Sequence, residues 1–314
     1  APLRSPGWSC RRRARRGTAL ARKSDPGNRR GDLRESQRVE HPGGIGSCPR
    51  PFDQQSRPGT RRGVGAVVTR RVVVTGACGG LGRAIAARFR NEGWHVVGVD
   101  RREPDGDVHL DAFLLADIGA DGAVAELFEK IRRYDRLDAL VNNAAVQINK
   151  PITDTSDDEW SSVINTNVRS AFQAIRESTE MLSNSRGAVV NISSVHAIAT
   201  SVNVAVYAIS KGALSALTRS AAVELAASGV RCNAVLPGAV DTEMLRDGLS
   251  RRDHPDGPAG NLAALAAGTP LGFVATPDQI APSVVHLADG HQSPYTTGQM
   301  LVVDGGVTAK LGSE

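Results

Sequence analysis

The strongest constraint on the fold is a repeated alternation between short β-branched apolar runs and segments with helical period, from residue 70 to residue 306. In the first unit, Arg71–Val74 is strand-like, residues 75–82 are rich in glycine, and the following residues place Ile85 and Phe89 on one helix face. Parallel strands are joined by right-handed helical crossovers, so this alternation predicts a parallel sheet. The predicted fold class is α/β, one doubly wound parallel sheet with helices on both faces.

The first 68 residues differ sharply from the rest of the chain. They are rich in Arg, Gly, Pro and Ser and show no sustained apolar period, so we predict a disordered leader over 1–68 and one folded domain over 69–314. Three interpretations of the leader are open: a basic nucleic-acid arm, a transit peptide, or an upstream extension without function. The basic residues are interleaved with few aromatic ones, which favours the extension.

Charge and cysteine content exclude several classes for the folded part. Residues 1–70 hold 17 basic and 5 acidic residues, whereas the remainder holds 21 basic and 28 acidic residues, so the basic balance belongs to the leader. We therefore expect no nucleic-acid partner for the folded body, and no membrane partner because the apolar runs are only of strand length. The four cysteines (Cys10, Cys48, Cys78 and Cys232) show no C-x-x-C pair, which predicts a reducing, cytoplasmic setting and no metal site.

The glycine-rich turn after the first strand predicts a dinucleotide site. Gly76 permits a tight turn, Gly80 allows the backbone to approach a pyrophosphate, and Gly82 allows close packing of helix on strand. Asp100 ends the next strand, and its carboxylate can accept hydrogen bonds from a ribose while repelling a 2′-phosphate, which favours NAD over NADP. Arg101 and Arg102 follow at once and can pair with a 2′-phosphate, or they are solvated loop residues.

Two further strand ends supply candidate cofactor contacts. The third strand closes with Asp117 and Ile118, where a side chain can contact the adenine; alternatively, Asp117 caps the helix over 123–131. The fourth strand runs into Asn142–Ala145, whose small residues let a flat cofactor lie against the backbone. Within this segment, Asn142 is predicted to be structural.

The segment from Ser193 to Lys211 carries the candidate chemistry. Ser194 follows the buried strand 188–192, and Tyr207 and Lys211 lie four residues apart on one face of the next helix. A phenol, an ammonium beside it to lower its pKa and a hydroxyl facing both can exchange a proton with a carbonyl or alcohol oxygen. The bland alternative is a buried aromatic, a solvated lysine and a strand-end cap.

The remaining candidates lie on the helix that starts near Asp157 and on the loop after the sixth strand. Asn167 is a polar residue within an apolar stripe; it is either a buried amide satisfied by backbone, or the site where the helix opens and holds a water linked to Lys211. The hydroxyl of Thr242 and the backbone groups of its loop can form hydrogen bonds with a carboxamide. Residues 243–268 are predicted to be a long mobile lid.

Taken together, residues 70–306 resemble the short-chain dehydrogenase/reductase family, whose fold is Rossmann-type. The motifs match in order: Thr75–Gly82 for TGxxxGxG, Asp117, Asn142–Ala145 for NNAG, then Asn167, Ser194, Tyr207 and Lys211, and Pro237-Gly238 with Thr242. The one departure is Ala145 in place of the usual Gly.

The resemblance implies a catalytic tetrad. Tyr207 acts as general acid/base, Lys211 lowers its pKa and binds the nicotinamide ribose, Ser194 binds the substrate oxygen, and Asn167 holds a relay water. His196 is a tentative substrate contact together with Ser194 and Tyr207. The implied cofactor contacts are Thr75, Gly76, Gly79, Gly80, Leu81, Gly82, Asp100, Arg101, Asp117, Ile118, Asn143, Ala144, Tyr207, Lys211, Pro237, Gly238, Val240 and Thr242.

The implied activity is NAD(P)-dependent interconversion of a secondary alcohol and a ketone, with NAD as the favoured cofactor and a homotetramer (or dimer) as the assembly. His196 after a Ser-Val pair favours a sugar, polyol or hydroxy acid as the small-molecule substrate. One alternative is a 3-oxoacyl-thioester reductase using NADPH, with Arg246, Arg251 and Arg252 at the pocket mouth. Another is a non-catalytic dinucleotide-binding sensor.

Overall fold

The structure is a computed structural model that describes residues 69–106, 108–251 and 254–311. The predicted leader over 1–68 lies outside the described residues. The described part of the chain forms the α/β unit that the alternation of strands and helices predicts. Among the described residues, no helix combines the length and apolar character needed to cross a bilayer.

Seven parallel strands form one sheet in the order β3-β2-β1-β4-β5-β6-β7. Every pair of neighbours runs in the same direction, for example Val73 beside Val97 on one side and beside Leu140 on the other. The strand order reverses between β1 and β4, which is the place where open sheets of this kind bind ligands. The strands are β1 (Arg71–Thr75), β2 (His95–Asp100), β3 (Ala112–Leu115), β4 (Ala139–Asn142), β5 (Ala188–Ile192), β6 (Arg231–Pro237) and β7 (Met300–Val303).

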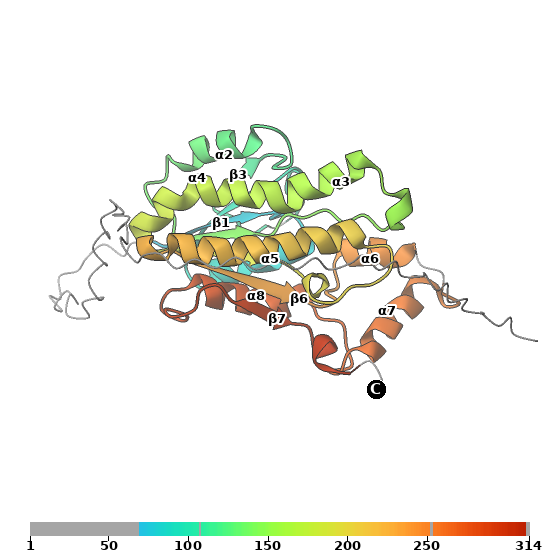
Figure 1. Cartoon of the computed structure of the whole chain (residues 1–314). Helices are drawn as coiled ribbons and strands as arrows, with labels where there is room; N and C mark the ends of the chain where they lie inside the picture. The colour runs from blue at the N-terminus through green and yellow to red at the C-terminus, as the bar shows by residue number, and fades with distance from the viewer. Residues whose placement is uncertain (1–68, 107, 252–253, 312–314) are drawn as a thin grey trace, which may run out of the picture. The chain divides into compact units, whose positions relative to one another are not determined.

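Helices cover both faces of the sheet. Figure 1 shows α2 and α4 on one side of the sheet and α8 on the other, while α6 and α7 lie beyond the arrowhead of β6. The helices are α1 (Gly80–Asn91), α2 (Ala123–Ile131), α3 (Asp157–Ile164), α4 (Ser170–Ser185), α5 (Ala205–Leu225), α6 (Glu243–Ser250), α7 (Gly257–Gly268) and α8 (Pro277–Ala288). A π-helical segment over Asn165–Arg169 joins α3 to α4.

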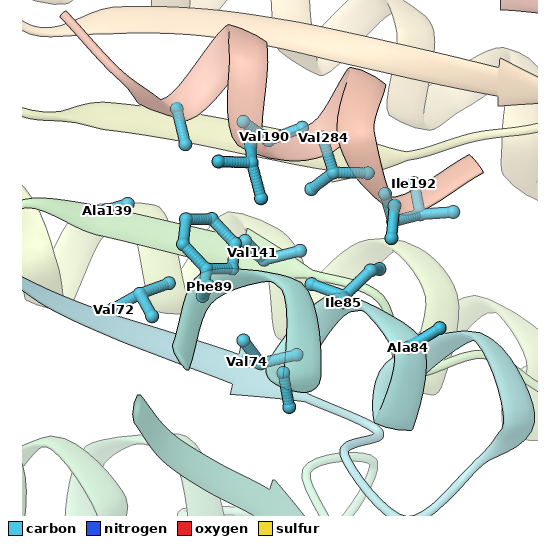
Figure 2. Close-up of a cluster of buried hydrophobic side chains, with 14 of the residues drawn as sticks. Val72, Val74, Ala84, Ile85, Phe89, Ala139, Val141, Val190, Ile192 and Val284 are labelled. Atoms are coloured by element: carbon cyan, nitrogen blue, oxygen red, sulfur yellow. The ribbon is translucent and has the colours of Figure 1, made fainter. Parts of the chain in front are cut away.

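Successive side chains of each strand point to opposite faces and so build two apolar cores. Val72 and Val74 of β1 lie in the core formed with α1 and α8, whereas Val73 lies in the core formed with α2, α4 and α5. Figure 2 shows the first core, with Phe89 of α1 beside strand residues and Val284 of α8. Because both faces are covered, the strands read as continuous apolar runs.

The structure corrects the prediction for residues 243–268. This segment is not a plain loop, since it forms α6 and α7. Thr242 is the N-cap of α6, and Pro258 stands in the first turn of the alanine-rich α7, which are ordinary helix signals. The ends of this excursion are held together, because Asp241 N donates to Ala275 O at 2.8 Å and Ala275 N donates to Ala239 O at 3.2 Å.

The apolar stripe around Asn167, on the helix that starts near Asp157, includes Trp160, Val163, Ala171 and Phe172 and is only partly buried. Trp160 and Phe172 are 42% and 50% exposed, so they do not belong to the core of this chain. Val163 and Ala171 of the same stripe are buried.

Candidate active site

The carboxyl ends of the strands open into one cavity of about 840 Å³. The cavity joins the glycine-rich turn at one end to Ser194, Tyr207 and Lys211 at the other. Of the predicted site residues, Thr75 and Asn167 do not line it. Those that do are Gly76, Gly79, Gly80, Leu81, Gly82, Asp100, Arg101, Asp117, Ile118, Asn143, Ala144, Ser194, His196, Tyr207, Lys211, Pro237, Gly238, Val240 and Thr242.

The turn between β1 and α1 has the backbone that a phosphate cradle needs. Gly76 has φ +67°, and a Cβ there would come within 2.8 Å of Ala144 Cα. A Cβ on Gly82 would collide with the Gly76 carbonyl oxygen, and one on Gly80 would lie 3.2 Å from Thr242 Cγ2. Side chains are thus excluded where backbone meets backbone, and the N-terminus of α1 faces the cavity. This cradle fits the pyrophosphate of a dinucleotide.

Thr75 lies beneath the turn rather than in the cavity. Its Oγ1 accepts from the backbone N–H groups of Asn143 and Ala144 at 3.0 and 3.1 Å, and the residue is 2% exposed. Asn143 Nδ2 in turn donates to the carbonyl oxygens of Thr75 and Gly76. The predicted contact of Thr75 is therefore replaced by a supporting position, in which it fixes the end of β4 against the turn.

Asn142 is tied to the neighbouring strand, as the prediction of a structural role requires. Its Nδ2 donates to Asn191 Oδ1 at 2.8 Å, and Asn191 Nδ2 donates to Thr218 Oγ1 at 2.9 Å. Both amides are buried, so each needs a partner inside the protein.

Asp100 presents its carboxylate at the end of β2 beside the turn. Oδ2 accepts from Cys78 N at 2.9 Å and Oδ1 accepts from Arg102 N at 3.1 Å, which fixes the carboxylate in the cavity wall. Arg101 is exposed and also lines the cavity. Asp117 accepts from Gly119 N at 3.0 Å and lines the cavity next to Ile118. The alternative that Asp117 caps the helix over 123–131 is wrong, because Gly122 is the N-cap of that helix and no side chain caps it.

Ser194, Tyr207 and Lys211 converge at the other end of the cavity. All three are buried, with Lys211 only 2% exposed, so the bland interpretation of a solvated lysine is wrong. Lys211 Nζ donates to Ile192 O at 2.8 Å and lies 5.4 Å from the centre of the Tyr207 ring. These positions join a hydroxyl, a phenol and an amine in a site sheltered from water.

Burial sets the pKa values of this group in the free protein. It raises the pKa of Tyr207 to about 12, although a hydrogen bond with the Ser194 side chain acts in the opposite direction. Burial also lowers the pKa of Lys211 to about 7. Desolvation thus dominates both pKa values, and by lowering the pKa of Lys211 it weakens the positive charge through which this amine would act on Tyr207.

Asn167 lies in the π-helical segment between α3 and α4, so the predicted local opening of the helix is confirmed. Its amide is buried and satisfied, since Nδ2 donates to Val146 O at 2.9 Å and Oδ1 accepts from Val146 N at 2.8 Å. Nδ2 also lies 3.0 Å from Ser210 Oγ, which donates to Tyr207 O at 2.7 Å. The two interpretations of Asn167 are thus compatible.

Polar side chains mark the part of the cavity beyond Tyr207. The His196 ring meets the Tyr207 ring edge-on, with ring centres 5.8 Å apart, and His196 Nδ1 lies 3.3 Å from Thr200 Oγ1. Gln147 Nε2 donates to Asn149 Oδ1 at 2.8 Å, and both residues line the cavity. Gln147 and Asn149 are not among the residues predicted from the sequence, although their place in the loop after β4 could have indicated them.

The α6 segment closes the cavity next to the turn. Thr242 Oγ1 accepts from Leu245 N at 3.4 Å as the helix cap, and Arg246 binds Asp241 through two hydrogen bonds of 2.7 and 2.9 Å. The guanidinium of Arg246 is therefore engaged within its own segment, which weakens the thioester-reductase alternative. Arg251 lines the cavity, and Arg252 lies outside the described residues.

No cluster of three or more His, Cys, Asp or Glu side chains suited to a metal ion occurs in the described part of the chain.

A family model described as enoyl-(acyl carrier protein) reductase, one of the short-chain dehydrogenase/reductase models, matches residues 76–308. The chain belongs to the short-chain dehydrogenase/reductase family. The match spans both the glycine-rich turn and the Ser194–Lys211 segment.

Two curated relatives in the family resemble the chain over most of their length. A 3β-hydroxysteroid dehydrogenase of Mediterraneibacter gnavus is 33% identical over 260 residues, covering 76% of this chain and 94% of the relative. A cyclopentanol dehydrogenase of Comamonas sp. is 34% identical over 263 residues, covering 78% of this chain and all of the relative.

Solved structures of the family give the same picture. The ligand-free aldohexose dehydrogenase of Thermoplasma acidophilum has a TM-score of 0.73 and 31% identity, covering 78% of this chain and 96% of that one. ElxO with NADP bound and 4-hydroxyisoleucine dehydrogenase with NADH each have a TM-score of 0.68 and 26% identity, covering 77% of this chain and all of theirs. This short-chain dehydrogenase/reductase is thus an NAD(P)-dependent oxidoreductase that interconverts a secondary alcohol and a ketone.

Proposed function

We propose that Tyr207 exchanges the proton of the reaction while Ser194 orients the substrate oxygen. The observation that carries this proposal is that Ser194, Tyr207 and Lys211 are all buried at the same end of the cavity, with Lys211 Nζ 5.4 Å from the centre of the Tyr207 ring. In the reducing direction the Tyr207 hydroxyl donates its proton to the carbonyl oxygen as the carbon receives hydride; oxidation is the reverse. The bound nicotinamide dinucleotide supplies or accepts that hydride.

Lys211 and Asn167 then support the proton exchange of Tyr207 from the side away from the substrate. With a pKa of about 7, the Lys211 amine takes up and releases protons near neutral pH, and Ile192 O holds it in place. Asn167, in the opened helix, and Ser210 bonded to the Tyr207 carbonyl occupy the side from which water can replenish the proton. We assign Asn167 the relay water and Lys211 the nicotinamide ribose.

NAD is the proposed cofactor. Asp100 presents a fixed carboxylate where an adenosine ribose would end, and a second negative charge on that ribose would be repelled. We propose that the other predicted cofactor contacts that line the cavity also bind this cofactor.

A polar hydroxylated molecule, such as a sugar, polyol or hydroxy acid, is the proposed substrate. Its support is the amide pair of Gln147 and Asn149 and the ring of His196, all lining the cavity beside Tyr207. Hydroxyl groups of a substrate can form further hydrogen bonds with these polar side chains, whereas an apolar substrate offers none. The aldohexose dehydrogenase named above is consistent with this substrate class.

Turnover by the purified full chain tests these assignments. Nicotinamide absorbance is followed with NAD and with NADP across sugars, polyols, hydroxy acids, cyclic alcohols and 3-hydroxyacyl thioesters. We expect the highest kcat/KM with NAD and a sugar, polyol or hydroxy acid, and a His196→Phe variant that loses that selectivity. Preference for an apolar cyclic alcohol would overturn the substrate class, and NADP-linked thioester turnover would restore the alternative.

Assembly into a homotetramer is part of the proposal. Phe172 on α4 and Ile209 and Val223 on α5 are 50%, 45% and 79% exposed, and such apolar side chains are usually covered when helices pair between subunits. Light scattering of the purified chain measures the mass of the assembly, and a monomer at micromolar concentration would contradict it.

We also propose a cytoplasmic location. Cys78 and Cys232 are both free and buried, and burial raises the pKa of the Cys232 thiol to about 12. Thiols kept in this form suit a reducing compartment.

A further inference from the structure

An ion pair joins two distant segments across the wall of the cavity. Arg102 follows Asp100 after β2, and Glu243 begins α6; their side chains meet with Arg102 Nη1 3.3 Å from Glu243 Oε2. Both residues line the cavity, next to the carboxylate that we assign to the adenosine ribose. The pair therefore occupies the place where NAD and NADP differ.

The backbone on each side of this pair is fixed by other contacts. A change of partner by Arg102 therefore requires only that its side chain moves. Arg102 N donates to Asp100 Oδ1 at 3.1 Å, and its carbonyl oxygen lies 3.4 Å from Cys78 Sγ. On the other side, Glu243 follows Thr242, which lies against Gly80 of the turn.

The neighbouring cation is engaged in a similar way. Arg83 of α1 donates to Cys78 O at 2.8 Å and to Asp105 O at 2.8 Å, and it also pairs with the Asp105 carboxylate. Two of the arginines around Asp100 are thus held by acidic side chains before any ligand arrives.

A guanidinium binds a phosphate or a carboxylate through the same fork of N–H donors, so the two compete. A 2′-phosphate beside Asp100 needs a cation to offset the repulsion from that carboxylate. Arg102 is suited to supply it, but Glu243 already engages its Nη1 and offsets its positive charge.

We propose that Glu243 is a specificity-determining residue of the cofactor site, because it engages Arg102 and so withholds that side chain from the 2′-phosphate of NADP. The inference rests on the proposed preference for NAD and extends it to a residue on α6. It also makes the cofactor choice depend on two parts of the chain 141 positions apart.

The expected effect is small but selective. Arg102 and Glu243 are 55% and 69% exposed at their side chains, and an exposed pair of this kind changes an equilibrium about two- to fivefold. Removal of the Glu243 charge should therefore raise the affinity for NADP relative to NAD by about that factor, while the affinity for NAD itself stays nearly constant.

Calorimetric titration of the full chain, without substrate, tests the inference. The probes are NAD, NADP, 5′-AMP and adenosine 2′,5′-bisphosphate, and the variants are Glu243→Gln, Arg102→Gln and the double variant. Glu103→Gln is the matched control, since it removes an exposed carboxylate from the same loop without facing the cavity.

Support requires that Glu243→Gln favours the 2′-phosphorylated member of each pair of probes, that the double variant loses this gain, and that the control shows none. The inference is overturned if Glu243→Gln changes both members equally, or if the gain survives without Arg102. A wild-type chain that binds NADP more tightly than NAD would refute the proposed cofactor preference alone, because the inference is decided by differences between variants.

Discussion

The buried end of the cavity and the surface edge beside α6 are held by different kinds of interaction. At one end Ser194, Tyr207 and Lys211 are buried, and burial sets the pKa values of Tyr207 and Lys211. At the edge beside α6, Glu243 and Arg246 are exposed and Asp241 is half-buried. Glu243 pairs with Arg102, and Arg246 pairs with Asp241.

The difference separates chemistry from selectivity. A buried polar group must keep its partners, so the geometry around Tyr207 is rigid and tolerates little change. An exposed ion pair is worth little, so residues at the α6 edge adjust preferences without endangering the fold. Three substitutions probe this contrast, from the largest expected effect to the smallest.

Replacing Tyr207 by Phe should have the largest effect. The ring still fills the buried site, but the proton donor is lost, and kcat should fall at least about a hundredfold. Affinity for NAD, measured by calorimetry, should stay within a factor of about two to three because no phosphate contact changes. Retained turnover would show that another group moves the proton.

Replacing Lys211 by Met should alter the pH dependence of stability. The Lys211 pKa is about 7 in the folded chain and near the ordinary 10.5 when unfolded, so between these values the unfolded chain binds the extra proton. The unfolding free energy of the wild type should therefore rise by about 1.4 kcal/mol per pH unit from this group as pH rises from 7 towards 10. Below pH 7 this group should make no pH-dependent contribution.

The Met variant lacks this titration, so its stability relative to wild type should be greatest at pH 7 and should decline by pH 9. Urea melts of both proteins at these two pH values give the difference. A difference independent of pH would mean that the amine stays charged inside the protein.

Replacing Asp241 by Asn should have the smallest effect. It removes the ion pair with Arg246, which lies at the surface, so unfolding free energy should drop by about 0.5 kcal/mol and less in high salt. Thermal melts at two salt concentrations check this value. A loss of unfolding free energy as large as that expected for a buried group would remove the contrast between the buried end of the cavity and the edge beside α6.

The sequence predicted the sheet well because its signals are local and strong. The β-branched runs and the strand-to-helix alternation placed the strand over 188–192 and the helix over 123–131 at their observed bounds. Motif order also brought Ser194, Tyr207 and Lys211 to one end of the cavity.

What sequence reasoning missed depends on burial and long-range packing. The pKa of Tyr207 rises because neighbours from several elements exclude water, and no spacing of residues reveals this. Thr75 was predicted to touch the cofactor, but its hydroxyl is used by the end of β4, 68 positions away. The helices over 243–268 were overlooked because the glycine residues of this segment resemble a loop, although Thr242, Pro258 and the alanine content signalled helices.

The clamped ends of the α6–α7 excursion have a consequence for how such proteins diversify. Because the backbone bonds between Asp241 and Ala275 and between Ala275 and Ala239 fix both exits, the intervening residues can change in length at a modest entropic cost. The segment is thus an insertion whose two ends are fixed to each other. Changes inside the segment are therefore expected to leave the strands beneath it and the positions of Ser194, Tyr207 and Lys211 unchanged.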